Sequence, residues 1–185
     1  DLHDLLDLQK LAVGFNPAHL VRSPARFDPV QLEVWQRQAV HALSSDEALE
    51  WMRPHLPNTL DAPSASAFAA VIHQNLLLPS DATYWAQAVF GELPEHDAEG
   101  AELIKTAGPV FFEVAAAAVR AHGTDWKAVT TAIREQTGRK GPELFKPLRQ
   151  ALTGRRDGPE LAPLLKIMTA ARAIARLERL SSAAP

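Results

Sequence analysis

Six basic side chains lie close together near the end of the chain. They are Arg139, Lys140, Lys146, Arg149, Arg155 and Arg156, and the interval that holds them contains one acidic residue, Glu143. The whole chain of 185 residues has a formal net charge of −3, so this positive charge is local. The balance argues against nucleic-acid binding over the whole surface, but it is compatible with one basic face.

No other set of residues has the spacing of a catalytic or metal site. The seven His residues include no pair three or four positions apart on a helix, so no helical metal pair is predicted. The sequence also lacks a Gly-x-Ser-x-Gly elbow and a phosphate-binding Gly loop. The acidic residues between positions 92 and 102 lack the spacing of a calcium loop, which favours a solvated surface.

Composition limits the fold and the compartment. The chain has 46% hydrophobic residues and many Ala, which favours a helical domain with a real core. It has no Cys, which fits a reducing compartment, and we expect the cytoplasm. No apolar run approaches the roughly 18 residues of a membrane span. Since the sequence opens with Asp1 rather than Met, we expect a piece of a longer protein.

The basic residues fall on a predicted helix, a turn and the start of a second helix. Leu144, Leu148 and Leu152 recur every four residues and form an apolar stripe. Pro142 suits the first helical turn, and Gly154 is a predicted stop. Lys146, Arg149 and Gln150 fall on the opposite face.

The rest of the chain is predicted to be helical as well, without a sheet. Asn16, Asp28 and Ser44 or Ser45 are predicted caps, the first two followed by Pro. Residues 91–102 contain acids and no base, which predicts a solvated joint between two helical parts. Thr124 is a predicted cap, and Gly123 and Gly138 are predicted helix ends.

Three blocks of the sequence resemble one known family. Lys-Pro-Leu-Arg-Gln-Ala-Leu-Thr-Gly at positions 146–154, followed by Gly-Pro-Glu-Leu at 158–161, is similar to the anticodon-binding region of bacterial glutamyl-tRNA synthetases. That family has Pro-Leu-Arg-x-Ala-Leu-Thr-Gly, followed by a short loop with Pro and an apolar residue. Further similarity lies at residues 173–180 and in Ser-Pro-Ala-Arg-Phe-Asp-Pro at 23–29.

The resemblance implies an all-α, two-part cage that holds the anticodon loop of a tRNA. It implies a stem-contact segment at 1–43 and anticodon-binding parts at 44–96 and 97–185. The family's nucleotide-binding motifs, similar to His-Ile-Gly-His and Lys-Met-Ser-Lys-Ser, are absent from this sequence. The parent is therefore expected to be a glutamate–tRNA ligase whose other half uses ATP and Mg²⁺. For this chain alone we expect no cofactor, no metal and no activity.

The resemblance also implies roles for single residues. Arg149 matches the residue that reads the first anticodon base, and Gly158, Pro159 and Leu161 match positions beside the first and second bases. Pro159 and Leu161 would pack against a splayed base, since loop bases are read on their exposed edges. Phosphate contacts, which give position and affinity, are expected from Arg26, Arg139, Lys140, Lys146, Arg155 and Arg156.

For the third anticodon base the chain has His73, Gln74 and Asn75 where many relatives have an Arg. Amides carry both donors and acceptors, so they can satisfy either C or G. The expected partners are tRNA(Glu) and possibly tRNA(Gln), bound by a monomer. The alternative is a helical protein-interaction module without an RNA role, which the negative net charge supports. Salt dependence separates the two, since counterion release makes tRNA binding steeply salt-sensitive.

Overall fold

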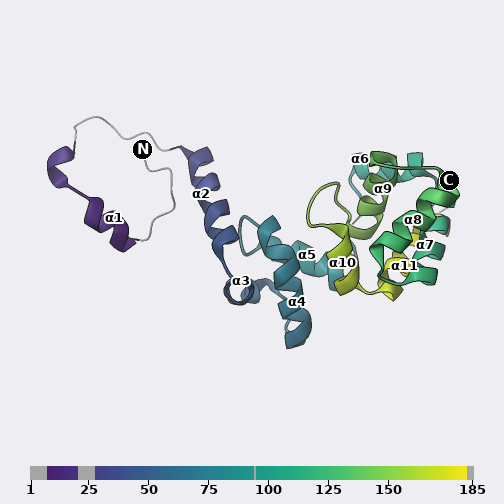
Figure 1. Cartoon of the computed structure of the whole chain (residues 1–185), viewed down its shortest axis with the longest axis horizontal. Helices are drawn as coiled ribbons and strands as arrows, with labels where there is room; N and C mark the ends of the chain where they lie inside the picture. Colours follow the sequence, from purple (N-terminus) through teal and green to yellow (C-terminus); the bar gives the residue numbers. More distant parts are fainter. Residues whose placement is uncertain (1–7, 21–27, 94, 183–185) are drawn as a thin grey trace.

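The computed structural model describes residues 8–20, 28–93 and 95–182, and within these ranges all regular secondary structure is helical, without a β-strand (Figure 1). This confirms the predicted all-α class. The N-terminal part contains α1 (Leu8–Gly14), a 3-10 turn η1 (Pro17–His19) and α2 (Pro29–Ala42). The middle contains α3 (Ser45–Met52), η2 (Arg53–His55), α4 (Ala62–Ile72), η3 (His73–Asn75) and α5 (Asp81–Phe90). The last part contains α6 (Ala98–Ala107), α7 (Pro109–His122), α8 (Trp126–Thr137), α9 (Pro142–Thr153), α10 (Leu161–Met168) and α11 (Ala170–Ser182).

Short polar side chains cap several of these helices. Ser44 and Glu47 form a reciprocal capping box at α3, and Asp28 accepts two backbone N–H bonds at α2. Both were predicted as helix starts. At α8 the cap is Asp125 rather than the predicted Thr124, because the Asp125 carboxylate reaches the N–H of Ala128.

The predicted acidic joint over residues 91–102 contains the start of a helix. Asp97 accepts from the N–H of Gly100 and begins α6, with Glu99 in the first turn. Acidic residues are stabilising at the positive end of a helix, so the second half of this run is helical. Its division of the chain into two parts stays a prediction.

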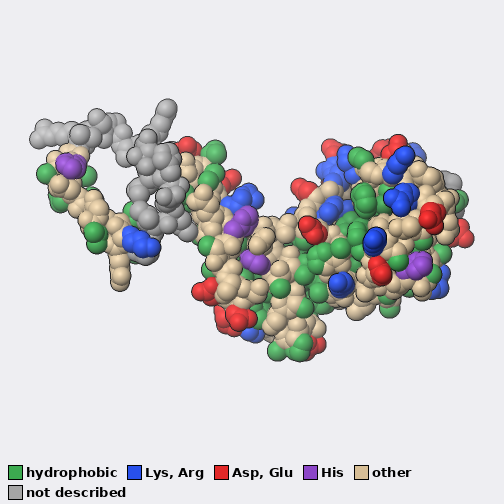
Figure 2. Space-filling model, in the orientation of Figure 1, with side chains coloured by type: hydrophobic (Ala, Val, Ile, Leu, Met, Phe, Trp, Pro, Cys, Tyr) green, Lys and Arg blue, Asp and Glu red, His purple; other side chains and the backbone are tan. Residues whose placement is uncertain are grey.

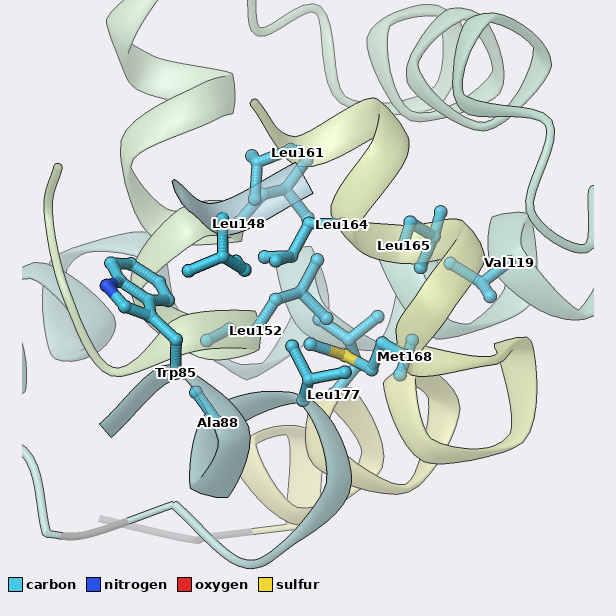
Figure 3. Close-up of a cluster of buried hydrophobic side chains, with 14 of the residues drawn as sticks. Trp85, Ala88, Val119, Leu148, Leu152, Leu161, Leu164, Leu165, Met168 and Leu177 are labelled. Atoms are coloured by element: carbon cyan, nitrogen blue, oxygen red, sulfur yellow. The ribbon is translucent and has the colours of Figure 1, made fainter. Parts of the chain in front are cut away.

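One cluster of buried hydrophobic side chains extends from Ala48 to Leu177 and includes residues from both predicted anticodon-binding parts. Figure 3 shows its centre, where Trp85 of α5 lies beside Leu148 and Leu152 of α9, and Leu164 comes from α10. Along α7, a row of small Ala residues allows close packing with α11. The predicted boundaries at residues 43 and 96 therefore stay predictions, and the core continues across the second.

The N-terminal helices add little to this core. No residue of α1 is buried, and α2 buries only Val40. The hydrogen bonds from Gln36 to the Leu77 carbonyl, at 3.1 Å, and between His41 and the Gln74 carbonyl, at 2.8 Å, hold α2 against the end of η3. No helix in the described ranges is long and apolar enough to cross a membrane.

A buried guanidinium joins three helices. Arg176 on α11 is 7% exposed and donates to the carbonyl of Leu152 near the end of α9 and to that of Gly91 after α5. Burial lowers the pKa of Arg176 to about 10, helped by the neighbouring Arg172 cation and opposed by Glu92. The group therefore remains charged at neutral pH.

Replacing Arg176 with Met should lower the free energy of unfolding by about 2–4 kcal/mol, because two buried carbonyls lose their charged donor. Urea unfolding measures the change. Arg179→Met is the matched control: that guanidinium pairs on the surface with Glu92, at 3.0 Å, and its removal should change stability little. Equal effects of the two substitutions would contradict the assigned role of Arg176.

Candidate nucleic-acid interface

Helix α9 forms where the sequence predicts it, and it positions Arg149. Pro142 occupies the first turn, and Gly154 ends the helix in the left-handed conformation with a φ of 72°. Leu144, Leu148 and Leu152 are all buried. Arg149 is consequently turned to the other side, where it is half-buried.

The 154–160 loop rests on two aromatic rings of α5. The hydroxyl of Tyr84 donates to the Thr153 carbonyl at 2.8 Å. Gly158 has a φ of 124° and lies so close to the Trp85 indole that an added Cβ would be 2.2 Å from a ring carbon. Glycine is therefore required at position 158 both by its backbone conformation and by the contact with Trp85.

Arg149 supports the far end of the same loop. Its Nη1 donates to the Pro159 carbonyl at 2.6 Å. Burial lowers the pKa of the guanidinium, and the nearby Asp157 carboxylate opposes that shift. Arg149 was expected to face an open basic surface. Instead it is half-buried and bonded to the loop, and its predicted contact with the first anticodon base stays a prediction.

Pro159 and Leu161 lie beside Arg149 as expected, but their side chains are used differently. Leu161 is 5% exposed and packs in the core with Leu164, and Pro159 is buried as well (Figure 3). The expectation that both side chains pack on a splayed base therefore needs correction, since neither has a free apolar face. Any contact with a base at these positions would involve the backbone.

His73, Gln74 and Asn75, the residues predicted to lie near the third anticodon base, differ in burial. His73 is 7% exposed, and its Nδ1 lies 3.0 Å from the Ala69 carbonyl, so its ring belongs to the helix end. Gln74 and Asn75 are exposed. With Glu160 and Pro163 they line a pocket of about 230 Å³, so the fold brings the third-base candidates next to the predicted loop.

The predicted phosphate-binding residues have different environments. Arg139 is half-buried, donates to the Ala107 carbonyl at 2.8 Å and lies over the Phe111 ring at 4.7 Å, so it completes the end of α6. Arg156 pairs with Asp97 and Glu99. Lys140 and Lys146 are exposed, and Arg26 lies outside the described residues. Figure 2 shows basic and acidic side chains side by side around α6, α9 and the loop.

Three residues of the site were not predicted from the sequence: Tyr84, Trp85 and His96. Gln150 was predicted on the face opposite the apolar stripe, but the structure buries it. Gln150 is 1% exposed, and its Nε2 donates to His96 Nδ1 at 3.0 Å and to the Gly154 carbonyl at 3.1 Å. Burial lowers the pKa of His96, against the attraction of Asp97, which favours the neutral ring that can accept this bond. The adjacent pair Tyr84–Trp85 was the only sequence feature that could have indicated this part of the site. Its partners in the loop lie about 70 residues further along the chain.

A loop that carries arginines and is held over aromatic rings is a feature of surfaces that bind unpaired RNA. A family model described as "Anticodon binding domain" matches residues 47–181. The chain therefore belongs to the anticodon-binding domain family.

The similar curated proteins are glutamate–tRNA ligases. Glutamate–tRNA ligase 1 of Halorhodospira halophila is 42% identical over 180 residues, which is 97% of this chain and 37% of that protein. Glutamate–tRNA ligase 2 of Nitrosococcus oceani is 43% identical over 173 residues, 94% of this chain and 37% of that protein. The chain thus spans little more than a third of the length of these relatives.

Two solved structures have the same fold. A glutamate–tRNA synthetase from Elizabethkingia anophelis superimposes with a TM-score of 0.71, covering 90% of this chain and 34% of that one. A glutamate–tRNA ligase from Elizabethkingia meningosepticum superimposes with a TM-score of 0.74, covering 91% and 35%. Both are 16% identical to this chain, so they show the fold alone.

Gly158→Ala should lower the free energy of unfolding by about 1–3 kcal/mol, because backbone strain adds to a clash with Trp85. Thermal or urea unfolding measures this. Gly138→Ala is the control: Gly138 has a φ of 70° with no atom near an added Cβ, so it reports strain alone. If the Gly138 variant were as destabilised as the Gly158 variant, the loop would not rest on Trp85 as described.

Proposed function

We propose that this chain is the anticodon-recognition part of a glutamate–tRNA ligase, which attaches glutamate to tRNA using ATP. The observation that carries the proposal is the family match over residues 47–181, which includes the Arg149 helix and the complete 154–160 loop. Catalysis, with its ATP and Mg²⁺, is assigned to the part of the parent protein outside this sequence. Within the described residues no group of His, Asp and Glu could hold a metal ion. The proposed partner is tRNA(Glu), bound by a monomeric enzyme in the cytoplasm.

The arrangement supports separate roles for two sets of residues, one contacting bases and the other contacting phosphates of the bound RNA. The 154–160 loop presents backbone groups near Arg149, and Gln74 and Asn75 line the adjoining pocket with Glu160. These groups can form hydrogen bonds with the edges of unpaired bases. Exposed Lys140 and Lys146 are left for phosphates, where they add affinity without sequence preference.

The 185-residue chain should bind an anticodon stem-loop with the glutamate anticodon more tightly than one with a scrambled anticodon. Fluorescence anisotropy at several salt concentrations measures both affinities. Because binding releases counterions from phosphates, log affinity should fall linearly with log salt concentration. Absence of RNA binding, or binding that is equal for both stem-loops, would contradict anticodon recognition and favour a protein-interaction module.

Arg149→Ala should weaken binding of the glutamate stem-loop by about 1–3 kcal/mol if the guanidinium reads the first base. The same substitution also removes the bond to the Pro159 carbonyl. To separate the two effects, the measurement is repeated with an abasic nucleotide at the first anticodon position. A base contact predicts that the penalty largely disappears there, whereas loop support alone predicts an unchanged penalty. Arg134→Ala, an exposed Arg of α8, is the control and should bind normally.

The parent enzyme should discriminate weakly between anticodons that end in C and in G. Gln74 and Asn75 are the exposed candidates, and each amide offers both a donor and an acceptor. Discrimination should fall well below the roughly 100-fold expected of a mismatched contact worth about 3 kcal/mol. Charging of tRNA(Glu) and tRNA(Gln) transcripts with glutamate, compared by kcat/KM, measures it. A strong preference for the anticodon ending in C would show that another residue reads this base.

A further inference from the structure

Arg155 lies on an aromatic ring and forms no ion pair with a carboxylate of the described residues. Its guanidinium carbon is 3.8 Å from the centroid of the Tyr84 ring, which places it on the face of that ring, and 5.7 Å from the Trp85 centroid. The two rings meet edge to face, with centroids 5.5 Å apart and an interplanar angle of 88°. The attraction of a cation to an aromatic face holds the guanidinium there.

The backbone beneath this stack is fixed by the protein itself. Tyr84 donates its hydroxyl proton to the Thr153 carbonyl, and the Thr153 hydroxyl accepts from the N–H of Arg155 at 3.2 Å. Gly154 between them adopts a φ of 72°, and a Cβ there would lie 2.7 Å from the Tyr84 oxygen. The chain therefore places Arg155 over Tyr84 before any ligand arrives, which reduces the entropic cost of binding.

The neighbouring Arg156 provides a contrast. Its guanidinium pairs with Asp97 and Glu99, so its charge is compensated. Arg155 is exposed, and among the residues that the structure describes no carboxylate pairs with it. Its guanidinium carbon contacts the Tyr84 ring, and the residue as a whole remains exposed to a ligand. A guanidinium plane is a surface on which unpaired bases stack.

We propose that Arg155 is a base-stacking residue, with its guanidinium held between the Tyr84 ring and an unpaired nucleobase of the bound RNA loop. This inference rests on the proposed function and changes the role expected of Arg155 from phosphate contact to base contact. The stacked group can be any base, since every base has a π face. Gly158 also contacts Trp85, so the platform lies beside the loop that contains Pro159.

The test compares Arg155→Lys with the unchanged chain in binding the glutamate anticodon stem-loop. Lys keeps the charge but loses the plane, so a phosphate contact would survive and a stack would not. We expect affinity to fall about 5- to 50-fold, within the range measured for stacking on one base, with an unchanged salt slope. Arg156→Lys is the matched control and should bind within about 2-fold, because its side chain is paired with carboxylates.

Abasic nucleotides then locate the contact. With each loop base removed in turn, the Arg155→Lys defect should disappear at one position and persist at the others. An Arg155→Lys variant that binds as well as the unchanged chain would overturn the stacking role while leaving the proposed function intact. A defect that persists at every abasic position would overturn the stacking role and assign Arg155 to support of the loop. Failure of the unchanged chain to bind the stem-loop would overturn the proposed function and the stacking role together.

Discussion

The relative placement of α5 and α9 depends on the buried charge of Arg176. Its guanidinium donates to the Gly91 carbonyl at the end of α5 and to the Leu152 carbonyl in the last turn of α9. The carbonyls at a helix C-terminus lack partners within the helix and carry partial negative charge, so a cation is favourable there. Helix α5 carries Tyr84 and Trp85, and α9 leads into the 154–160 loop. The Arg176 guanidinium therefore fixes the position of these two rings relative to the loop that rests on them.

Several other groups at the end of α9 form hydrogen bonds with residues that also shape the loop. Gly154 donates to the Gln150 carbonyl, and Thr153 accepts at its carbonyl from Tyr84. Gln150 in turn donates its side-chain amide to the Gly154 carbonyl. The hydrogen bonds that end the helix are therefore the same bonds that fix the start of the loop. Substitutions here should alter stability and RNA binding together, which is why the experiments on Arg149 and Arg155 compare RNAs instead of relying on loss of binding alone.

Much of the fold could be predicted from the sequence because helices are local structures. Pro142, the spacing of Leu144, Leu148 and Leu152, and Gly154 define α9 without knowledge of the rest of the chain. The same local reasoning missed the start of α6, because its exposed acidic residues were interpreted as a joint although Asp97 caps a helix. The resemblance was misleading for Leu161, whose apolar side chain was assigned to a base although it completes the core.

The site could be predicted only where its residues follow one another. The resemblance at residues 146–161 identified the loop, but nothing in that segment indicates Tyr84 or Trp85, which approach it through tertiary folding. Arg155 and Arg156 show the same limit, because they are adjacent and of the same type but have different environments. Arg155 lies over an aromatic ring, whereas Arg156 pairs with acidic residues at the start of α6.

This difference also explains how a chain of net charge −3 can present an RNA-binding surface. Arg139 and Arg156 are engaged within the protein, so the basic cluster contributes less positive potential than its six residues suggest. For the proposed function, exposed Lys140 and Lys146 would supply phosphate contacts. The remaining affinity would come from backbone groups of the loop, two exposed amides and the proposed stack on Arg155. Such contacts are directional and depend on unpaired bases, so they favour an RNA loop over a duplex of the same charge. A weakly basic surface has little sequence-independent affinity for nucleic acid, so base contacts decide which RNA binds. This suits a domain whose proposed task is to distinguish one anticodon from many.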